Sequence, residues 1–519
     1  MNTEPDSRLP ILVGVGQTVQ RDLDAAATLH SPLDLMTMAA RRALADSGAG
    51  SALATAIDVL AVVRMFEHSV GDRGMWANPF GSSNNVPWSL AKRLALHPDR
   101  AIYAEVGGQS PQRLINTLAA SLHAGEIRAA LLTGAEAIAT IRHATRQGIA
   151  LDWHEEAEGE FEDRWPGKPF VTPYEQRHGI AWPIHVYALF EQVRREAMGL
   201  DLARYRAEIG QLFAPFSTVA AANPFAQFPV AHTSEFLSSV SRENYLLCEP
   251  YTRWMVAQDA VNQSAAVIVT TVGTARAIGI AESRWVYLHG QADVDDLTVL
   301  RRSRLDRSEA QNLAVSSALT AASCALDDIR HLDCYSCFPI AVTSIAEPLG
   351  LPLDGSRPLT LTGGLPFFGG PGNNYSMHAI ATLAERLRHD PSAKGLIVAN
   401  GGYLSKHSAG VYAAHAPRGW STTDTQRLAA ELAGKGEVAV NEEATGPAAI
   451  ESCAAIWQKG VPADGFVVAR MRENGARCLA RVTPGDEAGL AALFENRVAG
   501  RPISITRDNG THRFTLAAG

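Results

Sequence analysis

The sequence predicts an α/β fold made of two copies of one helix-and-strand unit, followed by a β-rich domain at the end of the chain. Three observations support this fold class. Apolar residues at helical spacing alternate with short, continuously apolar segments typical of buried strands. This order occurs twice, and the last part of the chain instead has short strands separated by turn signals. Alternating strands and helices indicate parallel sheets with helices on both faces.

The first copy begins with a predicted helix at Leu33–Ser47, which leads into a buried strand at Ile57–Val63. A long segment follows. A second helix at Ile115–His123 then precedes the strand Ala129–Thr133, which ends in the turn Gly134-Ala135-Glu136.

The second copy repeats this order later in the chain. A predicted helix at Ala310–Ala325 precedes the strand Ile329–Tyr335. After another long segment, the helix Tyr375–Leu387 precedes the strand Gly395–Ala399, which ends in the turn Asn400-Gly401-Gly402. Because helix, strand, helix, strand and glycine turn recur in the same order, we interpret the chain as an internal duplication.

Residues from about 141 to 255 separate the two copies and have a different character. They are rich in aromatic residues and prolines and contain one predicted helix, Pro183–Met198. We expect an irregular insertion that packs on the sheet and carries ligand-binding loops. The predicted parts are an N-terminal half at 1–270 with this insertion, a C-terminal half at 271–417, a linker at 418–435 and a β-rich, barrel-like domain at 436–519.

The C-terminal domain is predicted from short strands and hairpin turns. The expected strands include Gly465–Met471, Pro502–Arg507 and Thr511–Leu516, and the turns are Asn474-Gly475 and Asn509-Gly510. A small barrel-like module follows from this pattern.

The composition argues against several classes of protein. A net charge of −8, with no block of basic residues, offers no footprint for a phosphate backbone, so we expect no nucleic-acid partner. The apolar runs are far shorter than the roughly 20 residues of a membrane span. The polar first ten residues lack the pattern of a signal peptide. We therefore expect a cytoplasmic protein without a membrane span.

The six cysteines are too few and too scattered for a disulfide framework, which fits a reducing compartment. Cys334 and Cys337 form a lone Cys-x-x-Cys pair without the further ligands that a zinc site needs. We therefore predict no metal site.

Short motifs occur in a defined order on both copies. The first copy has Ala124-Gly125-Glu126 and Gly134-Ala135-Glu136-Ala137, and the second has Tyr335-Ser336-Cys337-Phe338, the glycine-rich segment 363–371 and Ala399-Asn400-Gly401-Gly402. In this order they resemble the thiolase superfamily over roughly residues 8 to 415. With the added β-rich domain, the chain resembles in particular the type 1 thiolase-like proteins, which are acetyl-CoA acetyltransferase-like. The resemblance implies a duplicated thiolase fold with αβαβα layers.

The resemblance also shows which catalytic groups this chain lacks. Thiolases use a cysteine at the start of a buried helix as nucleophile, a histidine that lowers its pKa and a second cysteine that moves the proton. The matching positions here are Gly108, Gly370 and Ala399, and no cysteine occurs before Cys248. The acyl-cysteine route is therefore closed.

Three residues are candidates for a substitute catalytic role. Tyr335 matches the tyrosine of the steroid side-chain aldolases in this superfamily, whose motif is Tyr-Asp-Cys-Phe, although Ser336 replaces the aspartate. The alternative is a pocket tyrosine that only donates a hydrogen bond. His378 is either a base directed at the vacated site or a core residue. Cys337 is either a nucleophile or a small residue of the pocket wall.

The remaining candidates concern binding. Backbone N–H groups near Gly108 and Gly402 could hold the thioester oxygen, and the glycines allow close approach around a pantetheine tunnel. Ser110 is either a nucleophile or a helix cap. The residues expected to bind the substrate or its CoA moiety are Gly108, Ser110, Gly370, Asn373, Asn374, Gly402 and His407.

Several functions remain open from the sequence. The resemblance implies a protein of lipid metabolism that acts on or binds acyl-CoA thioesters and is acetyltransferase-like. The alternatives are a cysteine-free retro-aldolase acting on β-hydroxyacyl-CoA and a non-catalytic protein that binds CoA or lipid thioesters. Coenzyme A is expected as part of the substrate and no other cofactor is expected. The predicted oligomeric state is a monomer or a homodimer.

Overall fold

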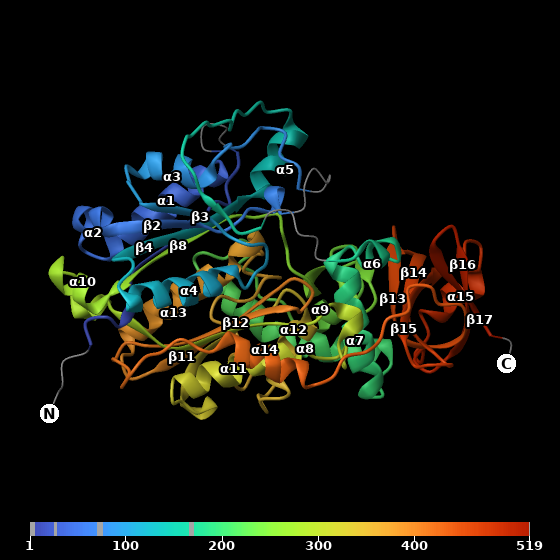
Figure 1. Cartoon of the computed structure of the whole chain (residues 1–519). Helices are drawn as coiled ribbons and strands as arrows, with labels where there is room; N and C mark the ends of the chain where they lie inside the picture. Colours follow the sequence, from blue (N-terminus) through green and yellow to red (C-terminus); the bar gives the residue numbers. More distant parts are fainter. Residues whose placement is uncertain (1–5, 25–28, 70–75, 166–170, 518–519) are drawn as a thin grey trace.

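The computed structural model describes residues 6–24, 29–69, 76–165 and 171–517. Within these residues the strands form two sheets, one of ten strands and one of seven. Figure 1 shows the ten-stranded sheet and its helices as the larger body, with most of the second sheet at the opposite end of the molecule beside the C-terminus.

The ten-stranded sheet is mixed, which corrects the prediction of parallel sheets. In spatial order its strands are β10 (Ile329–Cys334), β11 (Lys394–Gly401), β12 (Lys406–Ala413), β9 (Val286–Asp295), β1 (Pro10–Val19), β8 (Asn262–Thr271), β4 (Ala129–Ala137), β2 (Ile57–Val62), β3 (Arg100–Tyr103) and β5 (Glu162–Asp163). Parallel pairs lie toward the two ends, whereas β12, β9, β1 and β8 pair antiparallel. Only residues 402–405 join β11 to β12, and so short a turn returns the chain antiparallel, because a parallel crossover needs a dozen or more residues.

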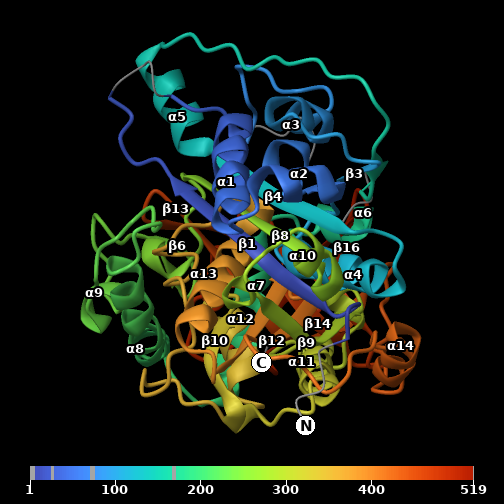
Figure 2. The same cartoon turned by 90° about the vertical axis from the view of Figure 1, so that its left-hand side faces the viewer.

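Two helices, α4 (Ser110–Ala124) and α13 (Tyr375–His389), form the middle of the larger body. They contact each other, and both also contact strands from the two halves of the sheet. The outer helix α1 (Pro32–Asp46) packs on β1 and β8, and α11 (Glu309–Ala321) packs on β9 and β12. Figure 2 shows α4 and α13 between the strands, with α1 and α11 at the two outer sides. The two halves of the ten-stranded sheet, with α4 and α13 between them, thus form separate layers. The predicted five layers, helix, sheet, helix, sheet and helix, are therefore confirmed.

The sequence explains where α4 begins and ends. Pro111 lies in its first turn, where a missing N–H costs nothing. Leu114, Leu118 and Leu122 follow at intervals of four residues and are buried in the central core. The helix ends at Gly125, whose φ of 78° a glycine adopts without strain. The start of α4 is therefore held at a defined place in the middle layer.

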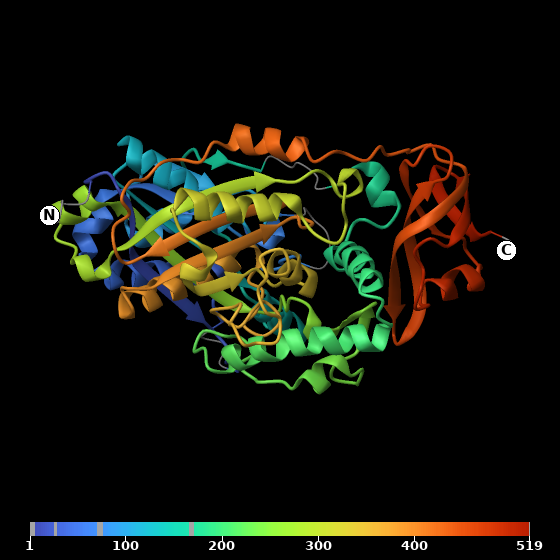
Figure 3. The same cartoon turned by 90° about the horizontal axis from the view of Figure 1, so that it is seen from below.

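The insertion contains more regular structure than predicted. The expected helix is present as α7 (Pro183–Ala197), and a second long helix, α8 (Leu202–Ala221), follows it. Pro215 lies inside α8, and a proline within a helical pattern predicts a break, which explains why the sequence did not reveal this helix. Figure 3 shows the green insertion helices alongside the larger body, with α7 reaching the red C-terminal strands.

The predicted C-terminal barrel is confirmed. Its strands are β13 (Gly446–Gln458), β14 (Val461–Met471), β15 (Arg477–Val482), β16 (Pro502–Asp508) and β17 (Thr511–Leu516), with α15 (Glu487–Ala492) after β15. The strand order β13-β14-β15-β17-β16 closes because β13 pairs with both β14 and β16, and β15 and β17 are parallel. A closed five-stranded barrel with this connectivity has the topology of an OB-fold.

The insertion is also part of the barrel's sheet. Its short strands β6 (Leu246–Cys248) and β7 (Tyr251–Thr252) extend the sheet beyond β13, where Cys248 pairs with Ile456. The C-terminal module is therefore joined to the larger body by strand pairing as well as by the chain itself.

The remaining α-helices are shorter and pack on strands or on neighbouring helices. They are α2 (Gly50–Ala56), α3 (Val86–Leu94), α5 (Ile138–Gln147), α6 (Pro173–Arg177), α9 (Ser234–Ser238), α10 (Val272–Ala277), α12 (Pro339–Ala346) and α14 (Thr425–Ala433). In the part of the chain that the structure describes, every helix is too short or too polar to cross a membrane. The same residues hold no group of three or more His, Cys, Asp or Glu side chains arranged as metal ligands.

Candidate functional site

The loop before α4 lies directly against Tyr335. A Cβ atom placed on Gly108 would be only 2.1 Å from Tyr335 Oη and 2.4 Å from Cζ of the same ring. Gly108 is the position at which the thiolase resemblance places the nucleophile. The phenol hydroxyl therefore occupies the space that a side chain at this position would fill.

Tyr335 is held in this place by its own surroundings. Its backbone N–H donates to Val398 O at the end of β10, and its ring lies edge-on to Tyr375 with 5.3 Å between centroids. The side chain is buried. Burial raises the pKa of Tyr335 well above its ordinary value, so the hydroxyl stays protonated at neutral pH.

A buried carboxyl lies behind the tyrosine pair. Tyr375 Oη shares a hydrogen bond of 2.6 Å with Thr362 Oγ1, and Asp333 accepts from Leu361 N at 2.8 Å. Burial raises the pKa of Asp333 to about 6. These bonds hold residues 361–362 against Asp333 and Tyr375.

The turn after β11 approaches the same loop from the other side. A Cβ atom on Gly401 would lie 1.8 Å from Gln109 Oε1 and 3.0 Å from the Gly107 Cα, so a side chain here would displace the Gln109 amide. Gln109 is fully buried, and neither Oε1 nor Nε2 has a hydrogen-bond partner within the described ranges. Asn400 Oδ1 is buried without a partner as well. Unpaired buried amides at one place indicate a site that a polar ligand or ordered water would complete.

Helix α7 of the insertion fixes this turn. Tyr187 Oη accepts hydrogen bonds from Asn400 Nδ2 at 2.9 Å and from Leu404 N at 3.0 Å. The Tyr187 ring stacks on Phe338, next to Cys337, with 4.3 Å between centroids. The sequence analysis did not identify Gln109, Tyr187 or Asn400 as site residues. Their motif neighbours were the available signal, but only the fold brings α7 to the turn.

The two predicted asparagines connect loops. Asn373 Oδ1 accepts from Gly107 N at 2.9 Å, and its Nδ2 donates to Arg64 O at 2.7 Å. Asn374 Nδ2 donates to Gly134 O at 2.7 Å. Asn373 therefore positions the backbone beside Gly108 and Asn374 holds β4, and their expected role in CoA binding stays a prediction.

His378 lies deeper in the molecule than expected for a base. Its Nδ1 donates to Gln17 Oε1 at 2.8 Å, and its ring packs edge-on against Phe368, 5.0 Å away. Burial lowers the pKa of His378 to about 3. The Phe368 ring in turn lies against Tyr375, so aromatic rings stand between His378 and Tyr335.

The other predicted side chains have ordinary partners. Ser110 Oγ donates to Glu105 O at 3.0 Å, and no histidine contacts it among the described residues. Cys337 Sγ is 3.8 Å from Asn400 Nδ2, and burial raises the thiol pKa to about 12. His407 Nε2 shares a bond of 2.9 Å with Ser308 Oγ, and burial lowers its pKa to about 4. None of these groups is ionised or poised as a nucleophile at neutral pH.

The two predicted glycines, Gly370 and Gly402, differ from Gly108. Gly370 N donates to Gln258 O at 2.8 Å, and a Cβ atom there would be 3.3 Å or more from its neighbours. Gly402 O accepts from Tyr187 Oη at 3.4 Å. A methyl group at the position matched to the thiolase histidine would therefore need only a small adjustment of its neighbours, while one at the position matched to the nucleophile would collide with Tyr335.

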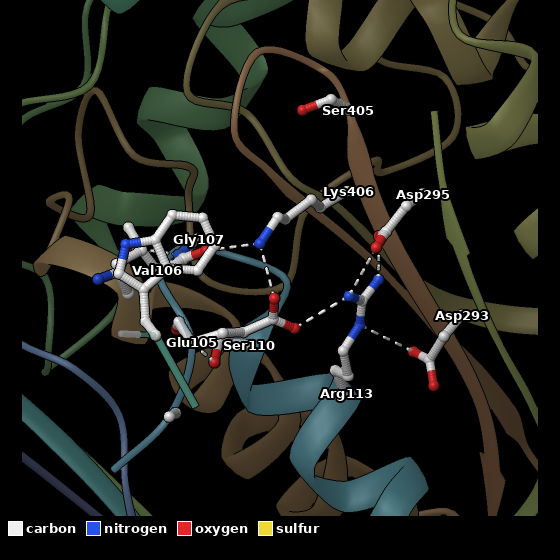
Figure 4. Close-up of polar contacts among 12 residues, drawn as sticks. Glu105, Val106, Gly107, Ser110, Arg113, Asp293, Asp295, Ser405 and Lys406 are labelled. Atoms are coloured by element: carbon white, nitrogen blue, oxygen red, sulfur yellow. Dashed lines mark hydrogen bonds and ion pairs between the residues drawn. The ribbon is translucent and has the colours of Figure 1, made fainter. Parts of the chain in front are cut away.

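A charged cluster lies beside the start of α4 (Figure 4). Lys406 Nζ is 2.6 Å from Glu105 Oε2 and 4.3 Å from the centre of the Trp165 ring. Arg113 joins Glu105, at 2.9 Å, to Asp295 on β9. The cluster holds the loop before Gly107 against β9 and β12, and so it stabilises one side of the site.

The outer surface of the barrel, at β14, β15 and β17, packs against residues 174–179 of the insertion. Tyr174 Oη accepts from Leu479 N at 2.8 Å, and His178 Nε2 accepts from His512 N at 2.7 Å. The Phe466 ring leaves no room for a Cβ atom on Gly179. OB barrels use the face of these strands for oligonucleotides, and here the insertion covers it.

Comparisons with known proteins match these features. A family model described as the thiolase-like protein type 1 additional C-terminal domain matches residues 427–510. A monomeric SCP2-thiolase-like protein type 1 from Mycobacterium smegmatis has a solved structure with 36% identity and a TM-score of 0.84, and the match covers 99% of this chain and 100% of that one. Comparison with curated proteins found no match.

Two more distant structures share the fold. An Ltp2-ChsH2(DUF35) aldolase matches with a TM-score of 0.56 and 14% identity, over 78% of this chain and 98% of that chain. An acetyl-CoA acetyltransferase from Syntrophomonas wolfei matches with a TM-score of 0.56 and 16% identity, over 78% of this chain and 99% of its own. At these identities the likeness concerns the fold alone.

Proposed function

The chain belongs to the SCP2-thiolase-like protein type 1 family, and from this premise we propose that it acts on acyl-CoA thioesters by cleaving a carbon–carbon bond without a covalent acyl-enzyme. The observation that carries this proposal is the Tyr335 hydroxyl, which fills the space beside Gly108. A proton-transferring group thus stands where a thiolase would hold its nucleophile. A retro-aldol cleavage of a β-hydroxyacyl-CoA is the reaction that uses such a group.

The proposed cleavage consumes no second substrate, oxidant or reductant. The bond between the α- and β-carbons breaks, the β-hydroxyl becomes a carbonyl, and the electron pair moves to the α-carbon of the shortened thioester. Tyr335 gives its proton to that carbon and takes the proton released by the β-hydroxyl. Because burial raises the pKa of Tyr335, the tyrosine acts as a proton donor and not as a standing phenolate.

The thioester oxygen carries the developing negative charge in this reaction. The backbone N–H groups of Gly108 and Gly402 are the proposed donors to it, since glycine leaves them accessible. Ser376 Oγ donates to Gly108 O at 2.6 Å and Asn373 accepts from Gly107 N, so the loop that carries the first donor is rigid before substrate binds. Fixed donors of this kind lower the barrier because they need no reorganisation.

Acyl transfer through a covalent enzyme intermediate is the weaker proposal. It requires an activated nucleophile, and burial keeps the Cys337 thiol protonated, with its pKa raised to about 12. Ser110 donates to a backbone carbonyl and lacks a base. Acetyltransferase activity is therefore not expected for this chain.

One observation favours a second candidate, a non-catalytic binder of CoA or lipid thioesters. The pKa values of Tyr335, His378 and His407 are all shifted away from neutrality by burial. A general acid or base usually works best when its pKa lies near the working pH. In an enzyme, direct proton exchange between Tyr335 and the bound substrate would have to compensate for the raised pKa. A carrier transfers no proton, so a shifted pKa would not affect it.

A monomer is the proposed oligomeric state. The relative from Mycobacterium smegmatis is described as monomeric. In this chain the barrel packs on the insertion through Ser452 Oγ, which donates to Leu189 O at 2.7 Å, and through β6. Sedimentation of the purified protein tests this proposal directly.

The test of the function compares wild type with Tyr335→Phe. Each is incubated with β-hydroxyacyl-CoA esters of several chain lengths, including steroidal ones, and mass spectrometry follows the shortened acyl-CoA and the carbonyl product. Loss of a general acid typically lowers the rate by about 10²- to 10⁴-fold. Tyr335→Phe should therefore lose turnover and keep CoA affinity in calorimetry.

The matched control is Tyr287→Phe, another buried tyrosine that lies on β9 outside the site. It should keep turnover. Binding without any product in wild type would support the carrier instead, and failure to bind every thioester would refute both proposals.

A further inference from the structure

Two buried arginines connect the C-terminal barrel to the turn that follows β11. Arg477 lies on β15 of the barrel and is fully buried, and Arg302 lies between β9 and α11 in the larger body and is 3% exposed. A buried guanidinium is costly unless its N–H groups find acceptors. The acceptors of these two side chains therefore indicate which parts of the chain they hold in place.

Arg477 is oriented within the barrel by Glu451 on β13. Its Nε donates to Glu451 Oε2 at 2.8 Å and its Nη2 donates to Oε1 at 2.6 Å, and this forked pairing fixes the direction of a guanidinium. The third nitrogen, Nη1, reaches the larger body, where it donates to Leu300 O at 3.1 Å and to Arg302 O. The barrel thus holds the backbone at residues 300–302.

Arg302 continues this connection to the turn of the candidate site. Its Nη2 donates to Tyr403 O at 2.8 Å. Tyr403 follows Gly402, whose N–H is a proposed donor to the thioester oxygen. The turn is held a second time, because Asp296 N donates to Ser405 O at 2.7 Å. The position of the turn therefore depends on the segment that contains Arg302.

The linker before the barrel joins the same parts through its backbone. Val438 N donates to Arg301 O at 2.9 Å, and Arg477 N donates to Ala439 O at 2.8 Å. Glu437 also pairs with the Arg301 guanidinium. The linker backbone thus lies between β15 and residues 300–302, so the barrel and this segment are connected twice.

Attachment of the barrel alone would not require two buried cations. The barrel already packs on the insertion through Phe466 and through the pairing of Ile456 with Cys248. Burial lowers the pKa of Arg302, and the nearby charge of Arg477 adds to this effect. Buried charged groups often contribute no more stability than apolar residues of similar size. What these arginines add is direction, since each donates to particular carbonyl groups.

We infer that the C-terminal barrel is a positioning domain for the candidate site, and that Arg477 and Arg302 are the positioning residues through which it fixes the turn 402–405. This inference rests on the proposed function in one respect, the assignment of the Gly402 N–H as a donor to the thioester oxygen. A donor displaced by about 1 Å stabilises a transition state poorly. The barrel should therefore influence the chemical step more than the binding of substrate.

Hydrogen–deuterium exchange of the full chain tests the connection without a substrate. The reporting amides are Leu404 N, which donates to Tyr187 Oη at 3.0 Å, and Ser405 N, which donates to Gly401 O at 3.1 Å. Arg477→Met removes the donor of the barrel and keeps a long unbranched side chain. Both amides should then exchange about tenfold faster or more, the change expected when a hydrogen bond from a charged donor is lost.

Arg302→Met breaks the same connection from the larger body, and it keeps the test valid if Arg477→Met fails to fold. It should give the same exchange pattern. The matched control is Arg195→Met. Arg195 is 1% exposed and also joins the larger body to the barrel, through Leu200 O and Asn496 O, both at 2.8 Å. Among the described residues its hydrogen bonds do not reach the turn, so the two reporting amides should exchange as in wild type.

Turnover supplies a second readout. With the β-hydroxyacyl-CoA esters of the functional test, Arg477→Met and Arg302→Met should lower kcat by about 10- to 100-fold and leave KM within about twofold of wild type. Arg302→Lys keeps a charged donor within the same segment and should recover part of the lost kcat. Arg195→Met should keep the wild-type kcat.

Two exchange results would overturn the inference. One is unchanged exchange at the reporting amides in both Arg477→Met and Arg302→Met. The other is equally fast exchange in Arg195→Met, which would show only a general loss of stability. If wild type cleaves no thioester but the expected exchange pattern is found, the proposed function fails and the positioning of the turn by the barrel stands. If wild type is active and the variants raise KM without lowering kcat, the inference fails and the proposed function stands.

Discussion

Replacing Gly108 by alanine puts a methyl group where the Tyr335 hydroxyl now lies. The new carbon would be 2.1 Å from Oη, against an ordinary contact of 3.4 Å or more. The phenol must therefore move by more than about 1 Å, and the ring cannot move freely because Tyr375 packs against it. Overpacking of this kind costs about 1 to 3 kcal/mol of unfolding free energy. A displacement of about 1 Å at a reacting group can lower turnover by about 100-fold.

A double-mutant cycle isolates this contact. Gly108→Ala, Tyr335→Ala and the double variant are unfolded in urea and compared with wild type. The alanine at 108 should cost far less when Tyr335 is already shortened, with an interaction energy of about 1 to 3 kcal/mol. Additive costs would show that the two residues do not share the space, and the site as described would be wrong.

Gly370→Ala is the matched control for the steric argument. Neither Gly108 nor Gly370 has a positive φ, so an added methyl group strains neither backbone. At Gly370 the nearest atom would be 3.3 Å away. Its unfolding free energy should change by less than about 1 kcal/mol, because a neighbour need move by only a few tenths of an ångström and the methyl group also reduces the freedom of the unfolded chain.

Two further predictions concern residues that the sequence did not identify. Tyr187→Phe removes the acceptor for Asn400 Nδ2 and Leu404 N, so unfolding in urea should show a loss of about 1 to 3 kcal/mol, and turnover should fall about tenfold while CoA affinity persists. Equal losses in turnover and affinity would contradict a positioning role. Burial raises the pKa of Glu67 to about 7, so the fold favours its protonated form. That stabilisation is complete below about pH 4 and is lost as the pH rises through 7. Relative to Glu67→Gln, wild type should therefore lose about 3 kcal/mol between pH 4 and pH 8; parallel pH profiles of unfolding free energy would refute this.

The sequence by itself determined the repeated layers and the C-terminal barrel, and it predicted that a thiolase nucleophile is absent. Each of these depends on local information. Hydrophobic period and turn residues act over a few positions, as at Asn509-Gly510, where both residues adopt a positive φ between β16 and β17. Motif order is also written along the chain, so Gly108, Gly370 and Ala399 could be matched without coordinates.

Sequence patterns did not reveal the antiparallel middle of the sheet or helix α8. Strand direction depends on how the connections run in space. The sequence predicted the turn at Asn400-Gly401-Gly402, but it did not show that a strand, β12, follows only four residues after β11. Pro215 concealed α8, since the surrounding packing and not the local propensity stabilises that helix.

Only the tertiary structure decided what fills the vacated site. Gly108 and Tyr335 lie more than 200 residues apart, and the fold alone brings a phenol hydroxyl to a missing side chain. The same holds for Tyr187, which the insertion delivers to the turn at Asn400. Contacts between distant segments depend on how whole layers pack. The residue pattern within one segment therefore does not predict which other segment it will contact.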